Sequence, residues 1–120
     1  MQDFTYSFEK LDVWKKSIEY VEELYTLTRS FPNDERFGLI SQLRRSGISI
    51  SSNLAEGSTR YSKKEKARFY QVAFGSLMES LNHLIIARHL NYVSEDDFIQ
   101  IRLVIHEIAN KINSLRKSLY

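Results

Sequence analysis

The residues best suited to chemistry in this sequence are the basic side chains between positions 44 and 68. This segment holds seven Lys and Arg against two Glu, a net charge of +5, whereas residues 1–43 carry −3 and residues 69–120 carry 0. Concentrated positive charge attracts polyanions, and the neighbouring aromatic Tyr61 can stack on nucleic-acid bases. We therefore predict a nucleic-acid-binding surface. Its residues are Arg44, Arg45, Arg60, Lys63, Lys64, Lys66 and Arg68.

Two explanations apply to the three lysines of this surface. Lys63, Lys64 and Lys66 fall on the first turns of a predicted helix, where positive charge opposes the helix macrodipole. Folding alone therefore gives no reason to place them there, whereas attraction to a polyanion does. A solvated loop whose lysines confer solubility is the alternative to nucleic-acid binding.

The two adjacent arginines are expected to point in different directions from one helix. Arg44 lies beside apolar residues on the helical wheel and suits a buried or interfacial ion pair with Glu79 or Glu56. Arg45 points outward and stays available to a ligand. The sequence leaves open whether Arg44 is exposed or buried in an ion pair.

Other chemistries find little support. The chain has no cysteine, which excludes disulfides, thiolate zinc sites, cysteine nucleophiles and iron–sulfur ligation. A di-metal carboxylate site needs Glu-x-x-His pairs, but Glu79 stands four residues before His83, so a hydrogen-bonded pair is expected instead. The sequence also lacks a nucleophile elbow and a phosphate-binding glycine-rich loop. We therefore expect no enzyme activity, no metal and no cofactor.

Two apolar stripes predict the helices of the first half of the chain. The first predicts a helix over about 11–30, ended by Pro32, from Leu11, Trp14, Ile18, Val21, Tyr25 and Thr28. The second predicts a helix over about 34–56 from Ile40, Leu43, Gly47, Ile50 and Leu54. Gly57 would then be the left-handed glycine that ends this helix. The small Gly47 would allow a neighbouring helix to approach closely.

Two capping serines predict the starts of the remaining helices. Ser62 and Glu65 form a capping box that opens a helix over about 63–90. Ser94, followed by three acidic residues, opens a helix over about 95–118. Apolar residues keep a heptad spacing along that last helix: Phe98, Ile101, Ile105, Ile108, Ile112, Leu115 and Leu119.

The length and composition fit these four helices. The chain of 120 residues suits one domain, 1–120, and its 4 Gly and single Pro are too few for a many-stranded β fold. Long helices joined by short loops predict an all-α, antiparallel up-and-down four-helix bundle.

Two features predict a homo-oligomer. Residues 69–87 hold one formal charge, Glu79, and are apolar on most sides, as is typical of a helix that is covered on most sides. Polar interruptions argue against a membrane span there. Residues 1–10 alternate Phe4, Tyr6 and Phe8 with polar residues, as expected for an extended arm that lies in a groove.

This opening segment has neither a secretion signal nor a membrane anchor, so a cytoplasmic location is expected.

Three motifs carry a resemblance to a known family. They are Phe-Pro-x-x-Glu-x-Phe-Gly-Leu-x-x-Gln-Leu-Arg-Arg at 31–45, Ser-Ile-x-x-Asn-Leu-Ala-Glu-Gly at 49–57, and Arg68-Phe69 with Gly-Ser-Leu-x-Glu at 75–79. The chain resembles the four-helix-bundle proteins encoded in intervening sequences of bacterial large-subunit ribosomal RNA genes. It is also similar to the accessory variability determinant of diversity-generating retroelements.

This resemblance implies a bundle assembled into a cyclic, five-subunit barrel with a basic surface and no established enzyme activity. Nucleic-acid binding is the role proposed for the family, and Arg44 and Arg45 match an arginine pair of the family. Retroelement members also bind a reverse transcriptase, so the alternative function is a protein-interaction adaptor. The predicted function is a non-enzymatic, homo-oligomeric RNA-binding protein of the bacterial cytoplasm.

Overall fold

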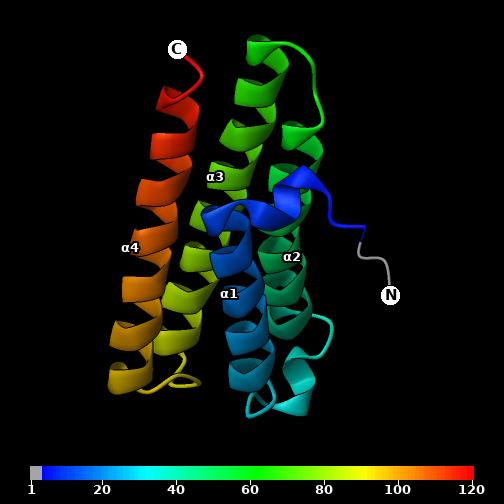
Figure 1. The fold of residues 1–120 in the computed structure, drawn as a ribbon. Coiled ribbons are helices and arrows are strands. Elements are labelled where there is room, and N and C mark those ends of the chain that lie inside the picture. The colour runs from blue at the N-terminus through cyan, green and yellow to red at the C-terminus, as the bar shows by residue number, and fades with distance from the viewer. Residues whose placement is uncertain (1–3) are drawn as a thin grey trace.

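The computed structural model describes residues 4–120 as four antiparallel helices (Figure 1). They are α1 (Asp12–Thr28), α2 (Leu39–Ser58), α3 (Lys63–His89) and α4 (Glu95–Lys117), with the 3-10 turns η1 (Ser7–Lys10) and η2 (Asn33–Glu35) before α1 and α2. The described residues form no strand. The predicted all-α four-helix bundle is confirmed.

Serine caps begin the last two helices where the sequence predicts them. The Ser62 hydroxyl accepts a hydrogen bond from the Glu65 amide at 3.1 Å, and the Ser94 hydroxyl accepts one from the Asp97 amide at 3.1 Å. The Glu65 carboxylate does not complete the capping box, because it accepts hydrogen bonds from Arg68 instead. Local capping therefore fixes both starts with one hydrogen bond each.

The helix predicted over 34–56 is shifted along the chain. α2 begins at Leu39, because residues 33–35 form the separate turn η2 after the extended Pro32. Glu35 in that turn caps α2 from outside, since its carboxylate accepts from the Leu39 amide at 3.2 Å. The same carboxylate accepts from the Tyr92 hydroxyl at 3.1 Å, which ties the α1–α2 connection to the α3–α4 connection.

The prediction that Gly57 ends α2 in a left-handed conformation is wrong. The helix continues to Ser58, and no glycine of the described chain has a positive φ. Gly57 is needed for a different reason: a Cβ there would lie 2.7 Å from the Tyr70 ring and 2.9 Å from the Phe69 Cβ. The glycine therefore allows α3 to approach α2 closely.

The core follows the heptad of α4 but not the predicted stripe of α1. Positions from Phe98 to Ile112 in the α4 heptad are buried, as expected. In α1 the predicted stripe is half-buried except for Thr28, because the stripe lies at the edge of the core. Trp14 on this stripe packs edge-on against Phe8 of η1, with the ring centres 5.2 Å apart. The buried residues of α1 are Val13, Ser17, Tyr20, Leu24 and Thr28.

The expected N-terminal arm is only partly extended. Residues 1–3 lie outside the described residues, and Phe4 and Tyr6 are exposed on the segment that follows. From Ser7 the chain turns into η1, because the Glu9 carboxylate accepts a hydrogen bond from the Tyr6 amide at 2.8 Å. Phe8 then packs against Trp14 of the same chain.

The four helices are unevenly spaced. α2 and α3 form the most extensive pair, joined by a hydrogen bond of 2.8 Å between the Ser49 and Ser76 hydroxyls. α1 and α4 form the least extensive pair of neighbouring helices, and two surface grooves of about 590 and 520 Å³ lie between them. An ion pair of 3.0 Å between Lys16 and Glu107 bridges α1 and α4, as does a second pair between Lys111 and Asp12.

A buried hydrogen bond joins α1 to α3 across the core. The Tyr20 and Ser80 hydroxyl oxygens lie 2.7 Å apart, and both side chains are fully buried. The Ser80 hydroxyl donates its one proton to the Leu77 carbonyl at 2.7 Å, so the Tyr20 hydroxyl is the donor to Ser80. Burial raises the pKa of Tyr20, which keeps the phenol protonated.

The two hydroxyls of this pair are expected to differ in their effect on stability. Ser80→Ala leaves the buried Tyr20 hydroxyl without a hydrogen-bond acceptor. It is expected to lower the free energy of unfolding by about 1–3 kcal/mol, although alanine is the better helix former. Tyr20→Phe leaves Ser80 bonded to Leu77 and is expected to cost only about 0.5–1.5 kcal/mol. Denaturant unfolding measures both. A double variant that costs the sum of the two single changes would contradict the orphaned-phenol explanation.

Candidate nucleic-acid interface

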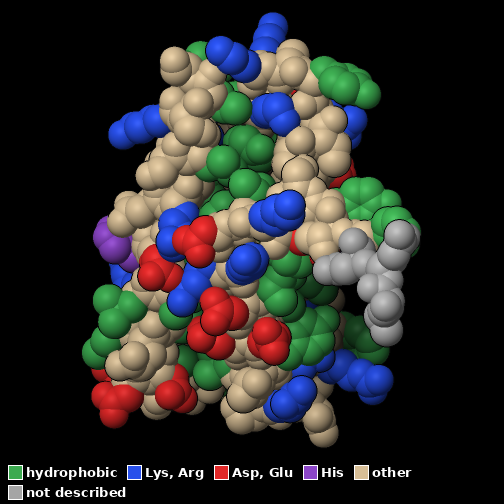
Figure 2. Space-filling model, in the orientation of Figure 1, with side chains coloured by type: hydrophobic (Ala, Val, Ile, Leu, Met, Phe, Trp, Pro, Cys, Tyr) green, Lys and Arg blue, Asp and Glu red, His purple; other side chains and the backbone are tan. Residues whose placement is uncertain are grey.

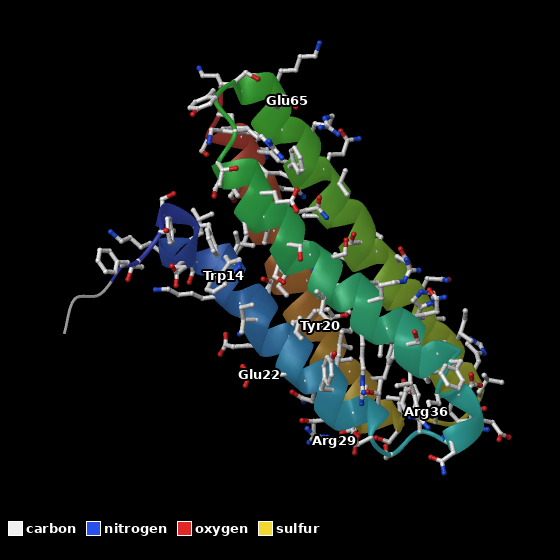
Figure 3. All side chains as sticks on the ribbon, turned by 90° about the vertical axis from the view of Figure 1, so that its right-hand side faces the viewer. Trp14, Tyr20, Glu22, Arg29, Arg36 and Glu65 are labelled. Atoms are coloured by element: carbon white, nitrogen blue, oxygen red, sulfur yellow. The ribbon has the colours of Figure 1, made fainter. Side chains whose placement is uncertain are left out.

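Five of the seven predicted site residues gather at one end of the bundle. Arg60 lies in the connection after α2, and Lys63, Lys64, Lys66 and Arg68 lie on the first turns of α3. Figure 2 shows Lys and Arg side chains over this upper end of the molecule. In Figure 3 the label of Glu65 marks the same end, and Arg29 and Arg36 lie at the opposite end.

Two arginines at this end stack on the same aromatic ring. The guanidinium carbon of Arg60 lies 4.5 Å from the centre of the Phe69 ring, and that of Arg68 lies 4.8 Å from it. Both distances are within cation–π range. A carboxylate steadies each arginine: Glu56 lies 3.8 Å from Arg60, and Glu65 accepts from Arg68 at 3.1 and 3.3 Å. These hydrogen bonds, and then the charge of Arg68, lower the pKa of Glu65 below its ordinary value.

Lys66 has a structural partner that the sequence analysis did not find. Its ammonium group donates to the Ser58 carbonyl at 2.9 Å, at the last residue of α2. A cation at a helix C-terminus is favoured by the macrodipole and satisfies a free carbonyl. Folding therefore does favour a lysine at position 66, contrary to the prediction from the sequence.

Among the predicted site residues at this end, Lys63 and Lys64 have free side chains within residues 4–120. Both are exposed, and within residues 4–120 neither makes a hydrogen bond or ion pair through its side chain. Tyr61, next to them in the connection, is fully exposed. Two cations and an aromatic ring are therefore accessible to a ligand.

The structure separates Arg44 and Arg45 from the other five residues. Both lie near the start of α2, and a rise of 1.5 Å per residue puts Arg45 roughly 20 Å along the helix from Ser58. The Arg45 side chain is 71% exposed, but it bonds Gln42 at 2.7 Å and lies 3.9 Å from Glu79. Glu79 also pairs with His83 at 3.3 Å, as the sequence predicts.

The predicted ion pair of Arg44 with Glu79 or Glu56 is wrong. The Arg44 guanidinium lies 4.2 Å from the centre of the Tyr25 ring, and its Nε donates to the Thr28 hydroxyl at 3.0 Å. These partners on α1 hold the guanidinium in place, and Arg44 is half-buried. Arg44 therefore joins α1 to α2, away from the five basic residues at the end of the bundle.

The end of α4 adds basic residues that the sequence analysis missed. Arg116, Lys117, Asn113 and Tyr120 line a surface hollow of about 380 Å³ together with Ala67 of α3. The net charge of each sequence segment does not reveal these residues, because residues 69–120 are neutral in total. The useful signal is the up-and-down topology, which brings the end of α4 beside the start of α3 (Figure 1). We call the surface of Arg60, Lys63, Lys64, Arg68, Arg116 and Lys117 the basic end.

Comparison with known proteins identifies the family of the chain. The sequence model of the 23S rRNA-intervening sequence protein family matches residues 9–114. The chain belongs to this family. Among curated proteins, none matches the chain.

A solved structure shares the fold of this intervening-sequence family member. It is the crystal structure of a protein of unknown function from the S23 ribosomal protein family of Bacteroides thetaiotaomicron, which is 24% identical with a TM-score of 0.80. The match covers 88% of this chain and 95% of that one. At this identity the likeness supports the four-helix fold alone.

Residues 4–120 of this family member contain neither a metal-binding cluster nor a membrane-spanning helix. Residues 4–120 contain no group of three or more His, Cys, Asp and Glu side chains placed to hold a metal ion. Within the same residues, the four helices are each too short or too polar to cross a bilayer.

The stability of this intervening-sequence protein is expected to depend on Lys66 but not on Lys63. Lys66→Met removes the charged cap of α2 and is expected to lower the free energy of unfolding by about 1 kcal/mol. Lys63→Met, the matched control on the same turn, is expected to change it by less than about 0.5 kcal/mol. Denaturant titration compares them, and equal losses in the two variants would contradict the capping role.

Proposed function

We propose that this protein is a non-enzymatic, homo-oligomeric protein that binds RNA through the basic end. The observation that carries the proposal is the pair Lys63 and Lys64, exposed and free of acidic partners within residues 4–120. Such lysines can neutralise phosphates without first breaking an ion pair. Arg60 and Arg68 beside them are held in fixed positions over Phe69, which lowers the entropy lost when they bind.

The choice of RNA rests on the family. Its description refers to the intervening sequence of 23S rRNA, so RNA is the natural polyanion to test first. Phosphate contacts carry no sequence information, and the proposal therefore concerns RNA as a class.

Assembly of several copies would strengthen this surface. The outer side of α3 exposes Val72, Met78 and Ile86 by 44%, 36% and 41%, and Glu79 is the single formal charge between residues 69 and 87. We propose that a second copy covers this side, in a cyclic assembly that the family resemblance suggests has five subunits. Symmetry would then repeat the basic end around a ring and raise the local positive potential.

RNA binding is expected to be strongly salt-dependent and to require the two free lysines. Lys63→Gln combined with Lys64→Gln removes two phosphate contacts, so the plot of log affinity against log salt should become shallower by about 1.4 for a single strand. Fluorescence anisotropy with a labelled oligouridylate, between about 50 and 200 mM salt, measures this slope.

Lys15→Gln is the matched control, because Lys15 is an exposed lysine on α1. Lys66 stays unchanged in this experiment, since its loss would also destabilise α2. Equal slopes in the double variant and the wild type would reject the basic end as the binding surface.

The mass in solution is expected to be several times that of one chain. Val72→Glu with Ile86→Glu places two charges on the exposed side of α3 and is expected to reduce the assembly to single chains with unchanged helical circular dichroism. Gln100→Glu, on the exposed side of α4, is the control. A monomeric wild-type protein in light scattering would remove the oligomer from the proposal.

A protein-interaction adaptor remains the second candidate. Ile99 and Leu103 of α4 are exposed and line a hollow of about 390 Å³ beside Phe98. An adaptor is expected to retain its partner after nuclease treatment, whereas a complex bridged by RNA is expected to dissociate.

A further inference from the structure

We infer that the hollow between Ala67 of α3 and the end of α4 binds an unpaired RNA base, so that the protein prefers single-stranded RNA to duplex RNA. This inference rests on the proposed RNA-binding function and adds a ligand class to it. The site, called the end hollow below, is formed by Ala67, Asn113, Arg116, Lys117 and Tyr120.

The end hollow is a shallow, open depression. Its volume of about 380 Å³ gives room for one base to lie against the surface. Asn113, Arg116 and Lys117 lie at helical spacing at the end of α4, so they share one side, and Tyr120 follows three residues after the helix. Ala67 forms the facing wall on α3 and, being small, leaves the space between the helices open.

The side chains of the end hollow match the needs of a splayed-out nucleotide. The Tyr120 ring is 84% exposed and offers a stacking surface. The Asn113 amide has both donors and an acceptor for the edge of a base. Arg116 and Lys117 supply positive charge for the attached phosphates. A base inside a duplex is stacked and paired, so it can use neither the ring nor the amide.

The neighbouring lysines give the RNA backbone a path to this hollow. Lys63 and Lys64 precede Ala67 by four and three residues, which places them on the same side of α3. Tyr61 lies just before them and is fully exposed, so a second base can stack there. A strand that crosses the basic end therefore has two exposed aromatic rings to stack on, Tyr61 and Tyr120.

Charge distinguishes the end hollow from the larger grooves. One groove between α1 and α4 is lined by Glu22, Glu23 and Asp97 with no basic residue, so it repels phosphate. In the other, Asp12 and Glu107 are already paired with Lys111 and Lys16, which leaves it close to neutral. Among the described residues that line the end hollow, none is acidic. The electrostatics therefore favour the end hollow for an anionic ligand.

The test compares a labelled oligouridylate with an RNA duplex of the same length in fluorescence anisotropy. The wild type is expected to bind the single strand more tightly than the duplex. Tyr61→Leu with Tyr120→Leu is expected to weaken single-strand binding by about tenfold or more, with little change in duplex binding or in the salt slope. Tyr6→Leu, at an exposed tyrosine far along the chain, is the matched control.

The outcomes separate this inference from the proposed function. Equal affinity for duplex and single strand, or full single-strand affinity in the double tyrosine variant, overturns the unpaired-base site. In either case the proposed function stands if the Lys63→Gln, Lys64→Gln variant binds RNA more weakly than the wild type. Failure of the wild type to bind either RNA overturns both. Circular dichroism establishes that the double tyrosine variant keeps its helices.

Discussion

The close approach of α3 to α2 at Gly57 is the constraint on which the geometry of the basic end depends. A side chain at Gly57 would collide with Tyr70 and with the Cβ of Phe69, so the absent methyl group sets how near the start of α3 lies to the end of α2. Phe69 is held there, and Arg60 and Arg68 both stack on its ring. The same proximity lets Lys66 reach the Ser58 carbonyl. One small residue thus positions several cations by packing, without attraction between them.

The unequal lengths of the helices explain why a recess exists beside this cluster. α1 has 17 residues and begins part-way along the bundle, whereas α3 has 27 and extends beyond it (Figure 1). At the basic end, therefore, α2, α3 and α4 pack without α1 beside them. The chain before α1 turns aside through η1, where Phe8 packs on Trp14. The end hollow and the exposed end of α4 follow from this shortfall of one helix.

The sequence predicted those features that depend on nearby residues. Ser62 and Ser94 cap their helices through amides three residues away, and the heptad of α4 needs only its own spacing. Among predictions that concern another helix, the close approach at Gly47 is confirmed, because a Cβ there would lie 2.6 Å from Leu24 of α1. Those that needed a specific side-chain partner on another helix were wrong or missing. Arg44 finds Tyr25 and Thr28 on α1, a choice that no wheel of α2 alone reveals. The basic residues at the end of α4 became part of the candidate site only when the topology placed them beside α3.

The hydrogen bond between Tyr20 and Ser80 also limits how the bundle can assemble. Apolar side chains tolerate sliding of one helix past another, because dispersion contacts are not directional. A shift of α1 by one turn would instead strand a phenol in an apolar core at a cost of several-fold to a hundredfold in folding equilibrium, about 1–3 kcal/mol. Tyr20 therefore helps to fix the register between two helices that otherwise face each other diagonally. Its hydrogen bond adds to the directional contacts of α1 with α2 and α4, and together they oppose a shifted arrangement.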